Sequence, residues 1–190
     1  MVVHGGTMEP IHLKRRSIRL AKYDYRSPGS YFVTIVTKSR YPWLGRLTAD
    51  GMLLSDVGNI VDECWHEIPL HFPHVTTDAW VIMPDHVHGI VSLHDHNSGG
   101  ARHPLTRQGP GEAFSRPVHG SLPTIMRSFK SAVTRRARVL SNRARDQVWQ
   151  RGYHEHVIRN GSELTRIRRY IAMNPERAIQ RMLAGGMLRT

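Results

Sequence analysis

Residues 75–93 read VTTDAWVIMPDHVHGIVSL, and no other stretch says more about the architecture of this chain. It contains two runs rich in β-branched and apolar residues, 75–83 and 86–93, and each run has the length of a strand. Only Pro84 and Asp85 separate the two runs, so the connection between them must be tight. We therefore expect two consecutive, antiparallel strands in the middle of a sheet.

His86 and His88 lie two residues apart in the second run. Side chains alternate between the faces of a strand, so both imidazoles project from one face while Val87 points to the other, towards the core. Their Cα atoms are then roughly 6.5 Å apart, a separation that two ring nitrogens can close onto one metal ion. The pair could also be ordinary surface residues, because similar pairs occur at 94–96 and 154–156 among the 13 histidines. The apolar frame around His86 and His88 favours them, since it would hold the ligands on a rigid element.

Hydrophobic periodicity predicts the remaining elements. They are a strand at 31–37, a small hairpin at 45–54, a helix at 57–68 capped by Ser55 and stopped by Pro69, a helix at 123–140, a fourth strand at 148–158, and a last helix capped by Ser162 and ended by Asn174-Pro175. The order strand, helix, two strands, helix, strand predicts the α+β class with a ferredoxin-like antiparallel sheet and its helices on one face. A further helix follows.

The length of 190 residues suits one domain, which we place at 29–178. A basic arm at 1–28 precedes it, a Gly/Pro-rich flexible loop at 94–120 interrupts it, and a tail at 179–190 follows it. The sequence contains no repeat and no Gly-x-x-x-x-Gly-Lys phosphate loop, so we expect no nucleotide cofactor.

The chain is strongly basic, with 27 Lys and Arg against 15 Asp and Glu and a formal charge of +12. Such an excess favours a polyanionic partner, and nucleic acid fits best because no amphipathic or acylated membrane anchor is recognisable. The charge could alternatively serve solubility. The single Cys64, the absence of an apolar run near ~18 residues and the lack of signal-peptide features together predict a cytoplasmic protein without a membrane span.

Many of the cations cluster in the second half of the chain, with aromatic residues between them. Bases can stack on aromatic rings while arginines follow the phosphates of a single strand, although a solvated basic face is the default interpretation. The candidate DNA-binding residues are Arg127, Lys130, Arg135, Arg136, Trp149, Arg151, Tyr153, Arg166 and Arg169.

Tyr170 lies in the last predicted helix, at the border of its apolar stripe. A tyrosine in such a place is commonly a packing residue with its hydroxyl at the surface. Asn174 stands four residues on and shares the same side of the helix, where its amide oxygen could be a third, hard metal ligand. Because Pro175 disfavours helical backbone at Asn174, a helix-capping role is the alternative.

Six blocks of this sequence, in this order, resemble the REP-associated tyrosine transposases, which are relatives of the IS200/IS605 single-tyrosine transposases. The blocks are RSIRL at 16–20, YFVTI at 31–35, WVIMPDHVHGI at 80–90, SFKS at 128–131, WQRGYHEHVIRN at 149–160 and YIAMNP at 170–175. The resemblance spans about residues 14–178, and only the 94–120 loop lacks a counterpart.

The resemblance implies an HUH endonuclease fold in which Tyr170 is the nucleophile and His86 and His88 bind a divalent metal ion, Mg²⁺ or Mn²⁺. Asn174 matches the position of the third ligand, where the IS200 relatives tend to have glutamine, and the substitution keeps the amide oxygen. Enzymes of this kind cut and rejoin single-stranded DNA through a 5'-phosphotyrosine intermediate, often at hairpins of palindromic repeats. The relatives include both homodimers and monomers.

Three other functions remain open. A nonenzymatic nucleic-acid-binding module could share the ferredoxin-like order, but the Lys/Arg-Gly-Phe block of RNA-recognition domains is missing. A rolling-circle replication initiator also uses an HUH site but commonly carries a helicase domain, for which this chain has no room. A domesticated, inactive transposase is disfavoured by the presence of His86, His88 and Tyr170.

Overall fold

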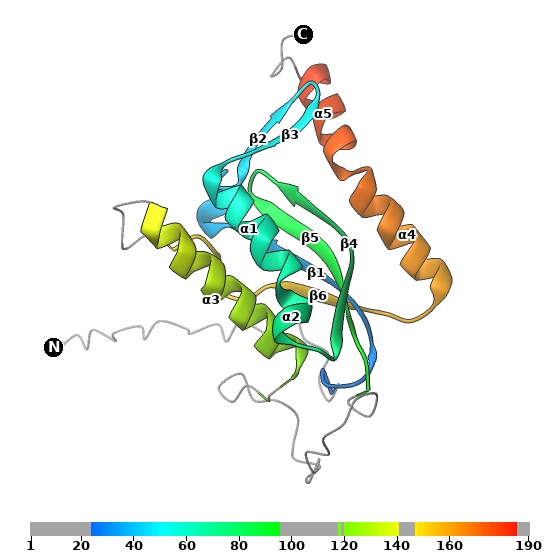
Figure 1. The fold of residues 1–190 in the computed structure, drawn as a ribbon. Helices are drawn as coiled ribbons and strands as arrows, with labels where there is room; N and C mark the ends of the chain where they lie inside the picture. Colours follow the sequence, from blue (N-terminus) through cyan, green and yellow to red (C-terminus); the bar gives the residue numbers. More distant parts are fainter. Residues whose placement is uncertain (1–23, 96–117, 119, 141–146, 186–190) are drawn as a thin grey trace, which may run out of the picture.

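The centre of the protein is a four-stranded antiparallel sheet in the order β4-β5-β1-β6 (Figure 1). The computed structural model describes residues 24–95, 118, 120–140 and 147–185. The strands are β1 (Gly29–Val36), β4 (Val75–Met83), β5 (His86–Leu93) and β6 (His154–Ile158). This is the ferredoxin-like order expected from the sequence, and the two strands predicted at 75–83 and 86–93 have the observed bounds.

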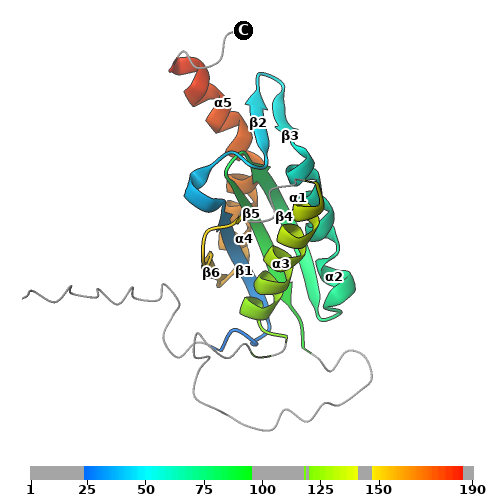
Figure 2. The same ribbon diagram turned by 90° about the vertical axis from the view of Figure 1, so that its left-hand side faces the viewer.

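Helices cover both faces of the sheet, not one face only (Figure 2). On one face, α1 (Asp56–His66) packs against α3 (Leu122–Leu140), and the short α2 (Ile68–His71) follows α1. On the other face lies α4 (Gly161–Ala172), which contacts β4. The sheet therefore separates two apolar clusters, one on each of its faces.

The larger cluster lies between the sheet and the pair α1 and α3. Its centre is Trp65, which is fully buried, stacks on Trp80 with 5.8 Å between ring centroids, and meets Phe129 edge-on at 5.5 Å. The Trp65 indole lies directly against the backbone of Gly89 in β5, where an added Cβ would overlap the ring. Glycine at this position thus lets α1 approach the sheet one residue away from His88.

The smaller cluster lies under α4 and consists of the buried residues Ile90, Ile167 and Ile171, with Phe32 packed against them. At the edge of the sheet, the Arg168 guanidinium donates to the Asp78 carboxylate at 2.6 and 3.0 Å. Asp78 lies where the pairing of β4 with β5 is shifted by a bulge between Thr77 and Trp80. The packing of α4 on the sheet therefore depends on a small apolar cluster and on the ion pair between Arg168 and Asp78.

Several predicted boundaries are wrong for identifiable reasons. The fourth strand was expected at 148–158, but β6 begins only at His154, because Gly152 at φ +80° breaks the extended backbone. Upstream of that break, Trp149 makes a single bridge with Thr37. Pro69 lies inside α2, beyond the end of α1 at His66.

The C-terminal part is more helical than expected. The N-cap of α4 is Asn160, whose side chain accepts from the Glu163 N–H at 2.9 Å, and not Ser162. After α4 ends, a new helix, α5 (Asn174–Ala184), begins where an end and then a tail were predicted. Pro175 occupies the first turn of this helix, a position at which proline loses no backbone hydrogen bond.

The helix α5 contacts a separate two-stranded hairpin formed by β2 (Gly45–Thr48) and β3 (Gly51–Leu54) (Figure 1). A short 3₁₀ turn, η1 (Lys38–Arg40), links β1 to this region. Most of the predicted arm at 1–28 and of the loop at 94–120, and the last five residues of the tail, lie outside the described residues. Within the described part of the chain, no helix combines the length and apolarity that crossing a bilayer requires.

Candidate active site

His86 and His88 start β5 and face α4, with their ring centroids 4.6 Å apart. Between them, Val87 is fully buried on the α1 and α3 side. The alternation expected from the strand pattern is therefore present, and both imidazoles share one face of the sheet. His88 is 6% exposed, which makes it one of the few polar side chains buried in the described structure.

Each imidazole is oriented by a partner on its Nδ1 atom. Asp85 Oδ1 lies 2.6 Å from His86 Nδ1, and Thr34 Oγ1 lies 2.8 Å from His88 Nδ1. Asp85 is held in turn by Arg40, whose Nη1 donates to Oδ2 at 3.1 Å. When Nδ1 carries the proton in such a bond, the lone pair is on Nε2, the arrangement found in metal-binding histidines.

The electrostatics keep His88 neutral. Burial is the main cause that lowers the His88 pKa to about 4; the nearby His86 charge lowers it further, and Asp85 partly opposes the shift. For Asp85, burial raises the pKa, but the hydrogen bonds and charges of His86 and Arg40 outweigh it and hold the pKa below its usual value. A neutral imidazole can act as a ligand, whereas a base with a pKa near 4 is too weak to take the proton of a phenol on its own.

Tyr170 reaches this histidine pair from α4. Its hydroxyl oxygen lies 3.3 Å from His88 Nε2, and the side chain remains 40% exposed. The Phe32 ring contacts both side chains: it stacks on His88 with 5.3 Å between ring centroids and meets Tyr170 edge-on with 6.0 Å between centroids. The structure thus brings Tyr170 next to His88, which is 82 positions earlier in the chain, and next to Phe32 of β1.

His86 and His88 are candidate ligands for a divalent metal ion. Within the described residues no group of three His, Cys, Asp or Glu side chains could hold a metal, so a site at His86 and His88 needs another kind of third ligand. Asn174 is 8% exposed at the start of α5 and lines the same cavity as Tyr170, which makes its amide oxygen a candidate. Two imidazoles and one amide leave coordination positions for phosphate oxygens and water.

A cavity of about 570 Å³ opens beside Tyr170 along α5. It is lined by Tyr170, Asn174, Arg177, Gln180, Arg181 and Ala184. Of the α5 residues in this lining, the sequence points only to Asn174, because the sequence pattern predicts a helix end and a tail for the rest of the segment. Asp85, Thr34 and Phe32 were also missed; the only available signal was that Asp85 is adjacent to His86.

Two of the cations predicted to bind DNA are occupied by protein partners. Arg136 Nη2 lies 2.6 Å from Glu67, and Lys130 Nζ donates to the Gln150 and Gly152 carbonyls at 2.6 Å each. Burial lowers the Lys130 pKa to about 8. Both side chains belong to α3, across the sheet from Tyr170, and both connect elements of the fold. A contact of either side chain with DNA stays a prediction.

The predicted stacking residues also have structural positions. Trp149 is 6% exposed and packs on Phe129 in the larger cluster, and Tyr153 is half-buried against that cluster. Trp149 therefore has little surface on which a base could stack, and base stacking on Tyr153 stays a prediction. The exposed candidates are Arg127 and Arg135 on α3, Arg151 in the segment before β6, and Arg166 and Arg169 on α4.

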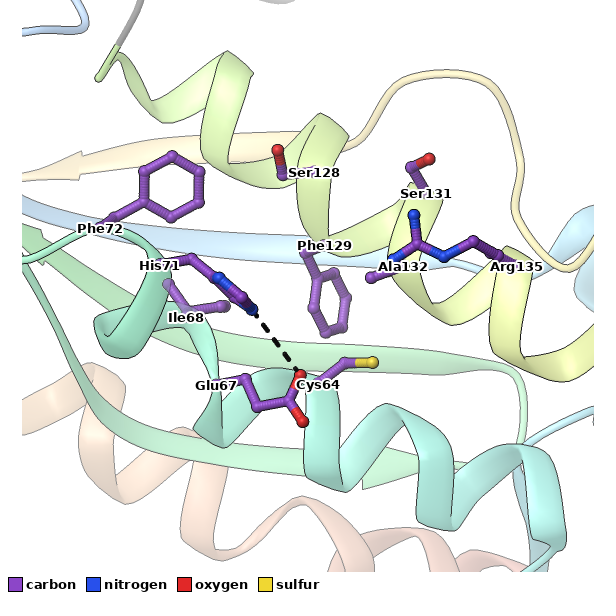
Figure 3. A pocket seen from close by; sticks show the side chains of 10 residues that line it. All are labelled: Cys64, Glu67, Ile68, His71, Phe72, Ser128, Phe129, Ser131, Ala132 and Arg135. Carbon is purple, nitrogen blue, oxygen red and sulfur yellow. Dashed lines mark ion pairs between the residues drawn. The ribbon is translucent and has the colours of Figure 1, made fainter.

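A second cavity, of about 290 Å³, lies on the α3 side of the sheet (Figure 3). Cys64, Ile68 and Phe72 line it from α1, α2 and the end of α2, and Phe129 lines it from α3. Burial raises the pKa of the Cys64 thiol, which keeps it protonated and unreactive. This cavity is separated from His88 and Tyr170 by the sheet.

The chain is similar in sequence to two proteins of Haemophilus influenzae and in fold to a solved structure. No protein-family model matches the chain. A Haemophilus influenzae protein described as "Uncharacterized protein" is 42% identical over 164 residues, which cover 85% of this chain and 88% of the relative. A second protein of that organism, "Putative REP-associated tyrosine transposase", is 27% identical over 161 residues, which cover 80% of this chain and 73% of the relative.

One solved structure has the same fold. It is a REP-associated tyrosine transposase bound to a REP hairpin, and it superposes with a TM-score of 0.55 at 19% identity, covering 84% of this chain and 74% of that one. At this level of identity the likeness establishes the architecture, an antiparallel sheet packed between helices.

Proposed function

We propose that the chain is a REP-associated tyrosine transposase, a metal-dependent endonuclease and strand transferase for single-stranded DNA, which its 27% identity to a putative member of that family and the shared fold support. The observation that carries the proposal is that the hydroxyl of the partly exposed Tyr170 side chain lies 3.3 Å from Nε2 of His88. Packing alone does not require the Tyr170 hydroxyl to lie beside the neutral, oriented imidazole of His88, whereas a nucleophile beside a metal ligand does.

The chemistry is a transesterification with Tyr170 as the nucleophile. The phenol oxygen forms a bond to the phosphorus, the bond from phosphorus to the 3'-oxygen breaks, and the phenol proton is given up as the 3'-hydroxyl is formed. The products are a 5'-phosphotyrosine and a free 3'-hydroxyl. Since one phosphodiester replaces another, a second 3'-hydroxyl can reverse the step, and no nucleotide hydrolysis is required.

A divalent ion would be held by His86, His88 and the amide oxygen of Asn174. Such an ion withdraws charge from a scissile phosphate, which a phenol with a pKa near 10 needs in order to react at neutral pH. The chain's own residues supply the orientation. Asp85 and Thr34 orient the two imidazole rings through Nδ1. The Phe32 ring contacts both His88 and Tyr170 and so fixes their relative position.

The proposed substrate is a DNA hairpin with a single-stranded flank. The solved relative is bound to a REP hairpin, and the net charge of +12 favours a polyanion. An exposed nucleophile on an open face also suits a flexible single strand better than a rigid duplex, since the scissile phosphate must come within bonding distance of Tyr170.

The test is formation of a covalent adduct. Protein is incubated with Mn²⁺ or Mg²⁺ and hairpin DNA from the flanks of its own gene, labelled at either end, and analysed on a denaturing gel. We expect the 3'-end label to migrate with the protein and the 5'-end label to be released on a fragment with a 3'-hydroxyl. Tyr170→Phe should form no adduct while DNA binding persists.

Tyr41→Phe is the matched control, because Tyr41 is another exposed tyrosine and is 59% exposed. It should form the adduct at the wild-type rate. If the wild-type protein binds these hairpins but forms no adduct with either metal, a nonenzymatic binding module becomes the better description.

A further inference from the structure

The helix α5 extends the surface that carries Tyr170. Along α4 and α5, Tyr170, Asn174, Arg177 and Arg181 follow one another at intervals of four, three and four residues, and all four line the 570 Å³ cavity. Within α5, such intervals place Asn174, Arg177 and Arg181 on one side of the helix, and Tyr170 near the end of α4 lines the same cavity. The nucleophile, the candidate amide ligand and two guanidinium groups thus share one open wall.

The charged side chains of this wall are all positive. Gln180 and Ala184 complete the lining, and none of the lining residues in the described part of the chain is acidic. Arg181 Nε donates to the Arg177 carbonyl of its own helix at 3.1 Å, which leaves its terminal nitrogens for another acceptor. Glu176 lies on the same helix but accepts from Gln180 at 3.2 Å and does not line the cavity.

Arg168 on α4 and Arg136 across the sheet are already paired with carboxylates of the protein. Arg168 forms its ion pair with Asp78 at 2.6 Å, and Arg136 across the sheet is paired with Glu67. By contrast, no ion pair of Arg177 or Arg181 is found among the described residues. Two guanidinium groups facing an open cavity without carboxylates are suited to bind a polyanion.

We propose that Arg177 and Arg181 form a phosphate-binding subsite for the backbone of the DNA strand next to the cleaved bond. The inference rests on the proposed function. One helical turn, a rise of roughly 6 Å, separates the two arginines, so they contact phosphates at successive points along the strand. The subsite aligns the strand along α5 and delivers the scissile phosphate to Tyr170. Its contacts are to the backbone and therefore add affinity without base preference.

The first experiment measures binding in a Tyr170→Phe background, in which no covalent product can form. Arg177→Gln and Arg181→Gln should each weaken binding of the hairpin with its single-stranded flank by about fivefold, and the double variant by more. Each substitution should also reduce the dependence of log K on log salt by about one ion. Arg138→Gln, an exposed arginine at the end of α3, removes the same charge across the sheet and should leave affinity and slope nearly unchanged.

The second experiment locates the contact on the DNA. Neutral methylphosphonates replace, one at a time, the phosphates that flank the cleaved bond. In the wild-type protein at least one replacement should weaken binding about as much as Arg177→Gln does, and the same replacement should have no further effect in the Arg177→Gln/Arg181→Gln protein. Arg177→Lys should largely retain affinity, because a phosphate contact needs the charge more than the planar fork.

Adduct formation separates this inference from the proposed function. With Tyr170 intact, the double variant should form the adduct with a raised KM and a nearly unchanged kcat. If the unaltered protein forms adduct normally and the double variant keeps wild-type affinity, salt slope and KM, the subsite is overturned while the function stands. If the unaltered protein forms no adduct on DNA that it binds, the proposed function fails.

Discussion

The two faces of the sheet are built differently. The face towards α1 and α3 is a continuous apolar layer, in which Trp65, Ile125 and Val133 are fully buried. The face towards α4 has only a small apolar cluster around Ile90 and Ile171, and beside it lie two histidines, a threonine and an exposed tyrosine. One strand, β5, serves both faces by alternating Val87 with His86 and His88.

This difference shows how a small domain separates stability from chemistry. Apolar burial stabilises in proportion to the area removed from water, so the larger layer supplies most of the folding free energy. The open face can then carry polar groups and an accessible nucleophile. Substitutions on the two faces should accordingly affect different measurements.

The largest expected effect is on the stability of the closed face. Ile125→Ala should lower the free energy of unfolding by about 2–5 kcal/mol, because the side chain is fully buried and leaves a cavity. Ile167→Ala on the open face, where the isoleucine is 8% exposed, should cost less and should slow adduct formation more, since α4 carries Tyr170. Urea unfolding and single-turnover cleavage measure the two quantities. Equal stability losses would remove the distinction between the faces.

A substitution at the histidine pair should affect chemistry far more than folding. His88→Ala should reduce the single-turnover cleavage rate at least about 100-fold, because it removes a proposed ligand beside the nucleophile. Binding of Mn²⁺, followed by calorimetry, should weaken with it. His71→Ala is the control: this histidine lies on α2, across the sheet, and pairs loosely with Glu67 at 3.9 Å. A His88→Ala protein that still cleaves at the wild-type rate would contradict the metal site.

The smallest effect is expected at the ion pair between Asp78 and Arg168. Both groups are partly exposed, so the pair adds little to global stability. It does position α4, and Arg168 stands two residues before Tyr170. Arg168→Gln should therefore leave the unfolding midpoint nearly unchanged and slow cleavage by about two- to fivefold. The charge-matched control Arg138→Gln should change neither, and a large loss of stability in Arg168→Gln would show that the ion pair holds the fold.

Much of the fold followed from local patterns. The β-branched and apolar runs in 75–93 predicted β4 and β5, and the spacing of apolar residues in 123–140 predicted α3 within one residue at its start. The shared face of His86 and His88 needed only the period of a strand. These predictions held because each depends on neighbours within one element.

The packing of other side chains could not be predicted from the sequence, for a common reason. Trp149 and Tyr153 stand between arginines in the sequence, yet they pack into the larger cluster, and Arg136 and Lys130 find protein partners on other elements. Whether an aromatic ring or a cation is free depends on what folds against it, which spacing does not reveal. The helix α5 was missed because Asn174-Pro175 marks the start of a helix as well as it marks an end.

The sequence by itself determined the order of elements, the basic character and the placement of two imidazoles on one side of a strand, because these follow from composition and backbone periodicity. Only the tertiary structure decided that Tyr170 meets His88, that Thr34 and Asp85 orient the two rings, and that Arg177 and Arg181 extend the wall of the cavity. Those relations join segments up to 82 residues apart, and the packing of α4 on the second face of the sheet is what brings them into contact.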